Sequence, residues 1–117
     1  MELSPQVLED ILSITRAVKA ERLTLSEGKT DLGRAHGLNP NSAAITIRSL
    51  KHMLNGERYR RALTVDATDY FLRRIREEDG NQGLELALAS LLSHIDYRHS
   101  TGVNVPSLQT LLAKHKK

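Results

Sequence analysis

Apolar residues recur at helical spacing along almost the whole of this 117-residue chain, and this period constrains the fold more than any other feature. Spacings of three and four residues place apolar side chains on one face of an α-helix. The alternation typical of strands and runs of β-branched residues are missing from the sequence. We therefore predict an all-α fold, a compact bundle of about five helices that forms a single domain over residues 1–117.

Proline, glycine and capping residues indicate where these helices begin and end. Ser4 with Pro5 predicts the first start, and Asn39 with Pro40 predicts the clearest one. Gly80 is expected to separate two consecutive helices. The expected helices cover about residues 4–22, 26–36, 39–55, 66–78 and 81–97, followed by a short terminal helix from about 106.

The same period predicts which side chains face the core. In the second expected helix, Leu32 and Ala35 share a face. In the third helix the inward set is Ala43, Ala44, Ile47, Leu50 and Leu54, and the outward set is Asn41, Ser42, Ile45, Arg48, Ser49 and His52. In the helix over 81–97 the inward set is Leu84, Leu88, Leu91, Leu92 and Ile95.

Charge is distributed unevenly along the chain. The formal net charge is +3, but residues 37–76 carry +5, whereas residues 77–97 carry −5 and contain no Lys or Arg. Such asymmetry is informative about binding partners and not about fold. It favours a polyanion as the partner of the middle of the chain.

A basic cluster with an adjacent tyrosine lies within this positive segment. Its members are Arg48, Lys51, His52, Arg58, Arg60 and Arg61, with Tyr59 among them. Arginine and lysine neutralise phosphates, and a tyrosine can stack on a base or donate to a phosphate. The alternative is that these arginines pair on the surface with nearby carboxylates, namely Glu57, Asp66, Asp69 and the run 77–79, while Tyr59 is half buried.

Residues 26–54 have the order of a helix-turn-helix, in which the second helix enters the major groove and its N-terminal side chains approach base edges. Asn41, Ser42, Ile45 and His52 would then lie closest to the bases, and Ser49 could also contact DNA. His36 departs from the usual pattern, because that position is normally apolar. The alternative is a two-helix corner with a glycine turn, which is ordinary packing in small α-domains.

Catalytic and metal-binding patterns are hard to find in this sequence. Cysteine is absent. His94 and His99 are five residues apart, which places their imidazoles on different helix faces, whereas paired metal ligands on a helix are three or four apart. We expect no enzymatic activity, no cofactor and no metal. The beginning of the chain lacks the features of a signal peptide, and no run of about 18 apolar residues is present, so we expect a cytoplasmic protein.

Part of the sequence resembles a small helical module found in bacterial restriction-type proteins, where it tends to precede an HNH nuclease or another effector domain. The resemblance covers about residues 39–97. It rests on Asn39-Pro40-x-Ser42-Ala43, Met53-x-x-Gly56-x-x-Tyr59-x-Arg61, Ala67-Thr68-x-Tyr70-Phe71-Leu72-x-x-Ile75 and His94-Ile95-x-Tyr97. It implies an accessory module that engages DNA or takes part in assembly, with a nuclease effector elsewhere in a longer protein or in a partner. The HNH motif itself is missing from this chain.

These observations lead to one leading hypothesis and one alternative. The leading hypothesis is a nucleic-acid-binding module, with DNA as the expected ligand, that uses a basic surface around the third helix and the loop after it. The expected contact residues are Asn41, Ser42, Ile45, Arg48, Lys51, His52, Arg58, Tyr59, Arg60 and Arg61. The alternative is a protein interaction module, such as a homodimer in which the acidic segment 77–97 of one copy meets the basic segment 37–76 of another.

Overall fold

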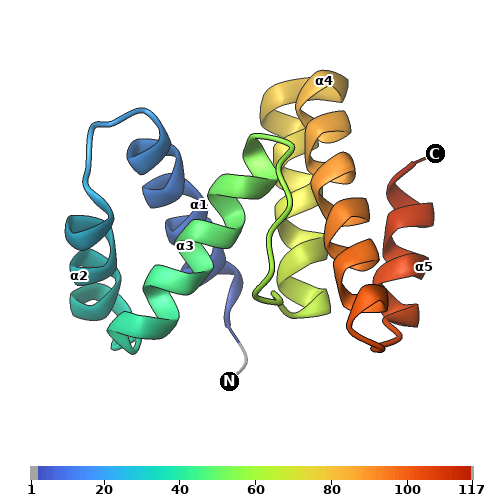
Figure 1. Cartoon of the computed structure of the whole chain (residues 1–117). Helices are drawn as coiled ribbons and strands as arrows, with labels where there is room; N and C mark the ends of the chain where they lie inside the picture. The colour runs from blue at the N-terminus through green and yellow to red at the C-terminus, as the bar shows by residue number, and fades with distance from the viewer. Residues whose placement is uncertain (1–2, 117) are drawn as a thin grey trace. The chain divides into compact units, whose positions relative to one another are not determined.

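The computed structural model describes residues 3–116, and the regular structure in this range is entirely helical (Figure 1). The elements are α1 (Pro5–Lys19), α2 (Leu25–His36), α3 (Pro40–Leu54), α4 (Val65–Ser100) and α5 (Pro106–His115). The predicted all-α fold of about five helices is confirmed. The chain divides into two compact units, Met1–Lys51 and His52–Lys117, and the last turn of α3 belongs to the second.

In the first unit, side-chain caps define the starts of α1 and α2. The Ser4 hydroxyl accepts a hydrogen bond from the backbone N–H of Val7 at 3.4 Å, as its position before Pro5 predicts. Thr24 and Glu27 form a reciprocal capping box, with distances of 3.1 and 2.9 Å. The capping box makes α2 begin at Leu25, slightly earlier than predicted.

The packing of α2 depends on Gly28. A Cβ atom at this position would lie 2.9 Å from Cγ2 of Ile14 in α1 and 3.4 Å from Cδ1 of Ile47 in α3. The absent side chain therefore allows α2 to approach both neighbours closely. The inward face of α2 consists of Gly28 and the fully buried Leu32, whereas Ala35 is exposed. The helix predicted from the shared face of Leu32 and Ala35 is present, and burial on this face ends one turn before Ala35.

The turn between α2 and α3 follows the sequence prediction. Gly37 has a left-handed backbone, with φ 69°, and its N–H donates to the carbonyl of Gly33. Asn39 Oδ1 then accepts the backbone N–H groups of Asn41 at 2.9 Å and Ser42 at 3.3 Å. The predicted N-cap of α3 is confirmed.

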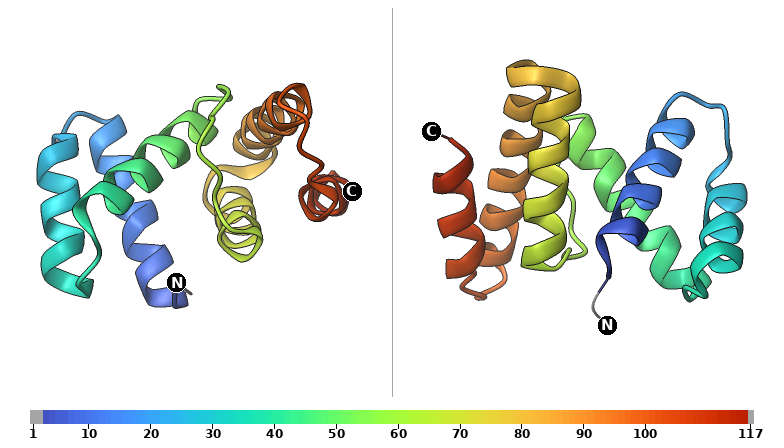
Figure 2. Two further views of the ribbon diagram at one scale, coloured as in Figure 1. Left: turned by 60° about the horizontal axis from the view of Figure 1, so that its bottom comes forward. Right: turned by 180° about the vertical axis from the view of Figure 1, so that it is seen from behind.

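In the second unit, α4 is a helical hairpin. Its backbone breaks at Gly80, where φ is 71° and ψ is −163°, so residues 65–79 and 81–100 form two halves. Figures 1 and 2 show the two halves folded back against each other. The predicted break at Gly80 is confirmed, and α5 packs against α4.

Large side chains from several segments fill the core of the second unit. Those with no more than 2% of their surface exposed include Met53, Tyr59, Phe71, Leu72, Ile75, Leu91 and His94. Leu92, which we expected to point inward, is 42% exposed. Adjacent helix positions differ by about 100° in direction, and Leu88, Leu91 and Ile95 already occupy the inward side. Within the described residues, no helix has the length and hydropathy needed to cross a membrane.

Candidate nucleic-acid interface

The predicted contact residues fall in both units, and those of the first unit lie on α3. Asn41, Ser42, Arg48 and Lys51 are exposed, and Ile45 is partly covered. This face therefore presents amide, hydroxyl and cationic groups, as the sequence indicates. Ser49, expected on the same face, is only 3% exposed, and this expectation is wrong. Its position borders the buried side that includes Leu50 and Ile47.

The predicted contact residues of the second unit lie at the end of α3 and in the extended backbone before α4. We call residues 57–63 the arginine segment. Arg58, Arg60 and Arg61 are exposed in this segment, whereas Tyr59 and Leu63 are buried. The segment is thus attached to the core by two apolar side chains while its cations are presented to solvent.

Two side chains from the second half of α4 hold the backbone of the arginine segment. The Ser90 hydroxyl donates to the carbonyl of Glu57. His94 Nδ1 lies 2.7 Å from the carbonyl oxygen of Tyr59. Because a carbonyl oxygen only accepts, Nδ1 must carry the hydrogen. Both α4 side chains are fully buried; the bond from His94 is buried, and the bond from Ser90 is partly buried.

The ring of Tyr59 stacks on the imidazole of His94, with centroids 4.2 Å apart and planes inclined by 8°. Only 2% of Tyr59 is exposed, and burial raises the pKa of its phenol. The ring is therefore not available to stack on a base, which corrects its place among the predicted contacts. Burial also lowers the pKa of His94, although the bond to the Tyr59 carbonyl acts in the opposite direction, and nearby Arg98 lowers it further. The neutral imidazole is favoured.

Another aromatic ring, which the sequence left ambiguous, does lie beside the exposed arginines. Cζ of Arg60 lies over the ring of Tyr97, 5.7 Å from its centroid. Tyr97 is partly exposed on the second half of α4. The spacing of 37 residues between the two gives no local signal, so sequence reasoning could not select Tyr97 over Tyr59.

Several carboxylates that could have neutralised the arginine segment are engaged by other groups. Asp69 interacts with Lys114 at 3.2 Å and His115 at 2.7 Å. Arg74 binds Glu77 and Glu78 one turn along its own helix. The carboxylate of Glu57 lies 3.3 Å from Nδ1 of exposed His52. Each of these carboxylates thus has a basic partner outside the arginine segment.

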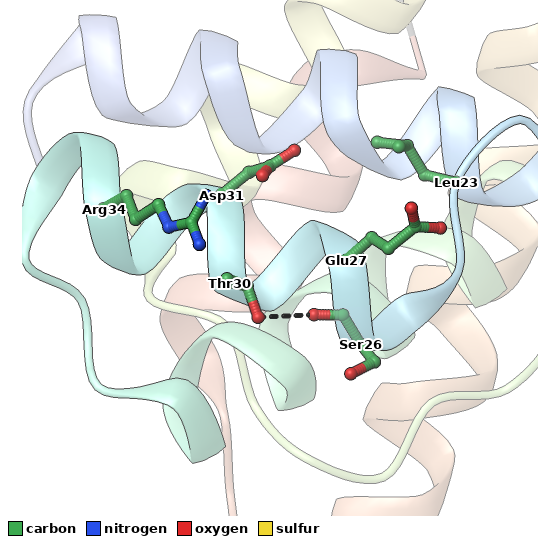
Figure 3. A pocket seen from close by; sticks show the side chains of 6 residues that line it. All are labelled: Leu23, Ser26, Glu27, Thr30, Asp31 and Arg34. Carbon is green, nitrogen blue, oxygen red and sulfur yellow. Dashed lines mark hydrogen bonds between the residues drawn. The ribbon is translucent and has the colours of Figure 1, made fainter.

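Two open hollows among the described residues are lined by none of the predicted contact residues. One lies on α2 and is lined by Leu23, Ser26, Glu27, Thr30, Asp31 and Arg34 (Figure 3). Its polar groups include Glu27, which completes the capping box, and Thr30, whose hydroxyl donates to the Ser26 carbonyl. The other is lined by Arg76, Asn81, Leu84, Glu85, Leu88, His115 and Lys116. Within the described residues, no three His, Asp or Glu side chains are grouped to hold a metal ion.

No protein family, curated protein or solved structure matches this chain. Functional inference therefore depends on its own residues.

Proposed function

We propose that this protein is a non-enzymatic nucleic-acid-binding module, with DNA as its expected ligand. The observation that carries the proposal is the arginine segment, in which Arg58, Arg60 and Arg61 are exposed while buried α4 side chains hold the backbone between them. Guanidinium groups match phosphate geometry and release counterions on binding.

Because the backbone of the arginine segment is fixed before a ligand binds, the free energy of binding should be more favourable. Ordering a flexible loop on a ligand costs conformational entropy, and this cost subtracts from the affinity. In the arginine segment, the carbonyls of Glu57 and Tyr59 already have fixed partners. The backbone at these two carbonyls needs no further ordering on binding, so less of the electrostatic gain is lost.

The α3 helix carries a second set of residues that we expect to contact the nucleic acid. Arg48 and Lys51 are placed to reach phosphates, and Asn41 and Ser42, in the first turn of α3, are exposed. The arrangement of α2, a glycine turn and a capped α3 is compatible with a helix whose N-terminal residues approach base edges. Ile45 and His52 have the same proposed role.

The test is a fluorescence-anisotropy titration with random duplex, single-stranded and cytosine-methylated DNA at about 50 and 200 mM salt, where phosphate-driven binding changes steeply. We expect saturable binding that weakens with salt. Arg60→Ala with Arg61→Ala should weaken binding to all sequences alike and reduce the salt slope by about two. The matched control, Arg73→Ala with Arg76→Ala, removes the same charge from exposed α4 positions.

Two results would contradict the proposal. Absence of saturable binding at low salt would exclude the nucleic-acid function. Equal loss of affinity in the test and control variants would show that net charge, and not the arginine segment, determines the affinity.

A second candidate function is self-association through the second half of α4. Leu92 is 42% exposed, and the exposed carboxylates Glu85 and Asp96, seven residues before it and four after it, share its helix face. An apolar and acidic face suits the basic segment of a second copy. Sedimentation equilibrium should then give twice the mass at low salt and dissociation at high salt, and Leu92→Lys should abolish the dimer. A monomer at all salt concentrations would exclude this candidate.

A further inference from the structure

The arrangement of Arg60 and Tyr97 distinguishes one arginine of the segment from its neighbours. Cζ of Arg60 lies over the face of the Tyr97 ring, 5.7 Å from its centroid. Arg60 is nevertheless exposed, and Tyr97 is only partly covered. The Arg60 cation therefore has an aromatic ring on one side, while its side chain remains exposed to a ligand.

A supported guanidinium plane is suited to stacking. Attraction between a cation and an aromatic face restrains the arginine, so less side-chain entropy is lost when a second flat group is added. Nucleobases stack on aromatic rings and on arginine planes. A phosphate, in contrast, needs only charge and hydrogen-bond donors, which an exposed arginine such as Arg58 supplies.

A base can stack on Arg60 only if one of its faces is not covered by a neighbouring base, and this requirement indicates the class of nucleic acid. Inside a duplex each base is covered above and below by its neighbours, whereas unpaired bases can be splayed out and stacked on protein groups. We propose that the arginine segment binds unpaired nucleotides, with one base stacked on the Arg60 guanidinium and the flanking phosphates on Arg58 and Arg61. This inference rests on the proposed nucleic-acid function and narrows its ligand.

The geometry of the segment agrees with this ligand. Residues 57–63 are not helical, and the exposed Arg58 and Arg60 alternate with buried Tyr59. In an extended backbone, alternate side chains project to the same side and are spaced by two residues, about 7 Å. A flexible single strand can adjust its phosphates and bases to such a short row of cations, whereas a duplex presents a fixed surface.

The experiment compares a random 20-nucleotide single strand with its duplex, by fluorescence anisotropy, for the full chain and four variants. Arg60→Lys keeps the charge and removes the plane, and Tyr97→Leu removes the supporting ring. The matched controls are Arg76→Lys, an exposed α4 position outside the proposed contacts that also keeps the charge, and Tyr97→Phe, which keeps the ring. We expect Arg60→Lys and Tyr97→Leu to lose about tenfold in single-strand affinity, a typical effect of losing one stacked base.

The same two variants should change duplex affinity by less than about twofold, and both controls should remain near wild type on both ligands. Equal losses in Arg60→Lys and Arg76→Lys, or a wild-type preference for duplex, would overturn the stacking inference while leaving nucleic-acid binding intact. Failure of the wild-type chain to bind either ligand would instead remove the proposed function. Arg60→Lys changes only an exposed side chain, so its result does not depend on whether Tyr97→Leu folds.

Discussion

His94 contacts Tyr59 in two ways at once: its ring lies parallel to the Tyr59 ring at 4.2 Å, and its Nδ1 donates to the Tyr59 carbonyl at 2.7 Å. One α4 residue thus fixes both the side chain and the backbone of the arginine segment. The imidazole is fully buried, and its Nε2 has no hydrogen-bond partner among residues 3–116. Protonation would place a charge on this buried group, close to Arg98.

The first prediction concerns the pH dependence of stability. Because burial lowers the pKa of His94, the neutral form stabilises the fold at pH values above the unfolded-state pKa of about 6.5, and this stabilisation is lost as pH falls further toward the folded-state pKa. Urea unfolding at several pH values should show stability falling by at most about 1.4 kcal/mol per pH unit from this group.

The control for this prediction is His94→Asn, whose side-chain N–H can replace Nδ1 as the donor but does not titrate. The variant should be less stable than wild type at neutral pH because the ring stack is lost. Its stability should depend less on pH than that of wild type. Parallel pH curves for the two proteins would show that His94 does not contribute to the acid sensitivity.

The second prediction concerns the contact between α5 and α4. The hydrogen bond from His115 is the main cause that lowers the pKa of Asp69; burial raises it, and Lys114 lowers it further. The stabilisation that the ionised Asp69 carboxylate contributes is therefore present above the unfolded-state pKa of about 3.9. It is lost as pH falls through the lower pKa of the folded state. Asp69→Asn should cost about 1 kcal/mol at pH 7 by urea unfolding, and the difference should shrink below about pH 4. Asp96→Asn, at an exposed α4 position, is the control and should change little.

The third prediction compares two glycines of α2. Alanine at Gly33 would meet only the carbonyl oxygen of Leu38 at 3.5 Å, so the higher helix propensity of alanine should stabilise the fold by about 0.5–1 kcal/mol. Alanine at Gly28 would lie 2.9 Å from Cγ2 of Ile14, a β-branched side chain with little freedom to move. We expect Gly28→Ala to destabilise the fold despite the same propensity gain. The melting temperatures of both variants, compared with that of wild type, test this prediction. If Gly28→Ala raised the melting temperature as much as Gly33→Ala, the close packing of α2 at Gly28 would be contradicted.

The features that sequence alone could predict are those set by local chemistry. Asn39 caps α3 and Gly80 breaks α4 because each acts on neighbouring backbone groups. The capping box of Thr24 and Glu27 was equally local and readable from its spacing, although our prediction began α2 at about residue 26.

The features that sequence could not predict depend on contacts distant along the chain. Tyr59 is buried because His94, 35 residues later, lies beside it, and no local pattern indicates this pairing. The exposure of Arg58 and Arg60 agrees with the charge pattern. The ring that lies beside Arg60, however, comes from α4 and is known only from the folded chain.

The last prediction tests whether holding the backbone of the arginine segment matters for binding when its charge is unchanged. Ser90→Ala removes the hydroxyl that donates to the Glu57 carbonyl and changes no charge. Leaving this carbonyl without its partner should cost about 1–3 kcal/mol of stability and loosen the segment. If nucleic-acid binding uses a held segment, affinity should fall several-fold while the salt slope stays near that of wild type, because the number of neutralised phosphates is unchanged. Ser93→Ala, one position before His94 and partly exposed, is the control. Unchanged affinity in Ser90→Ala would show that the segment binds without being held, and a reduced salt slope would show that the serine acts by altering the number of phosphate contacts.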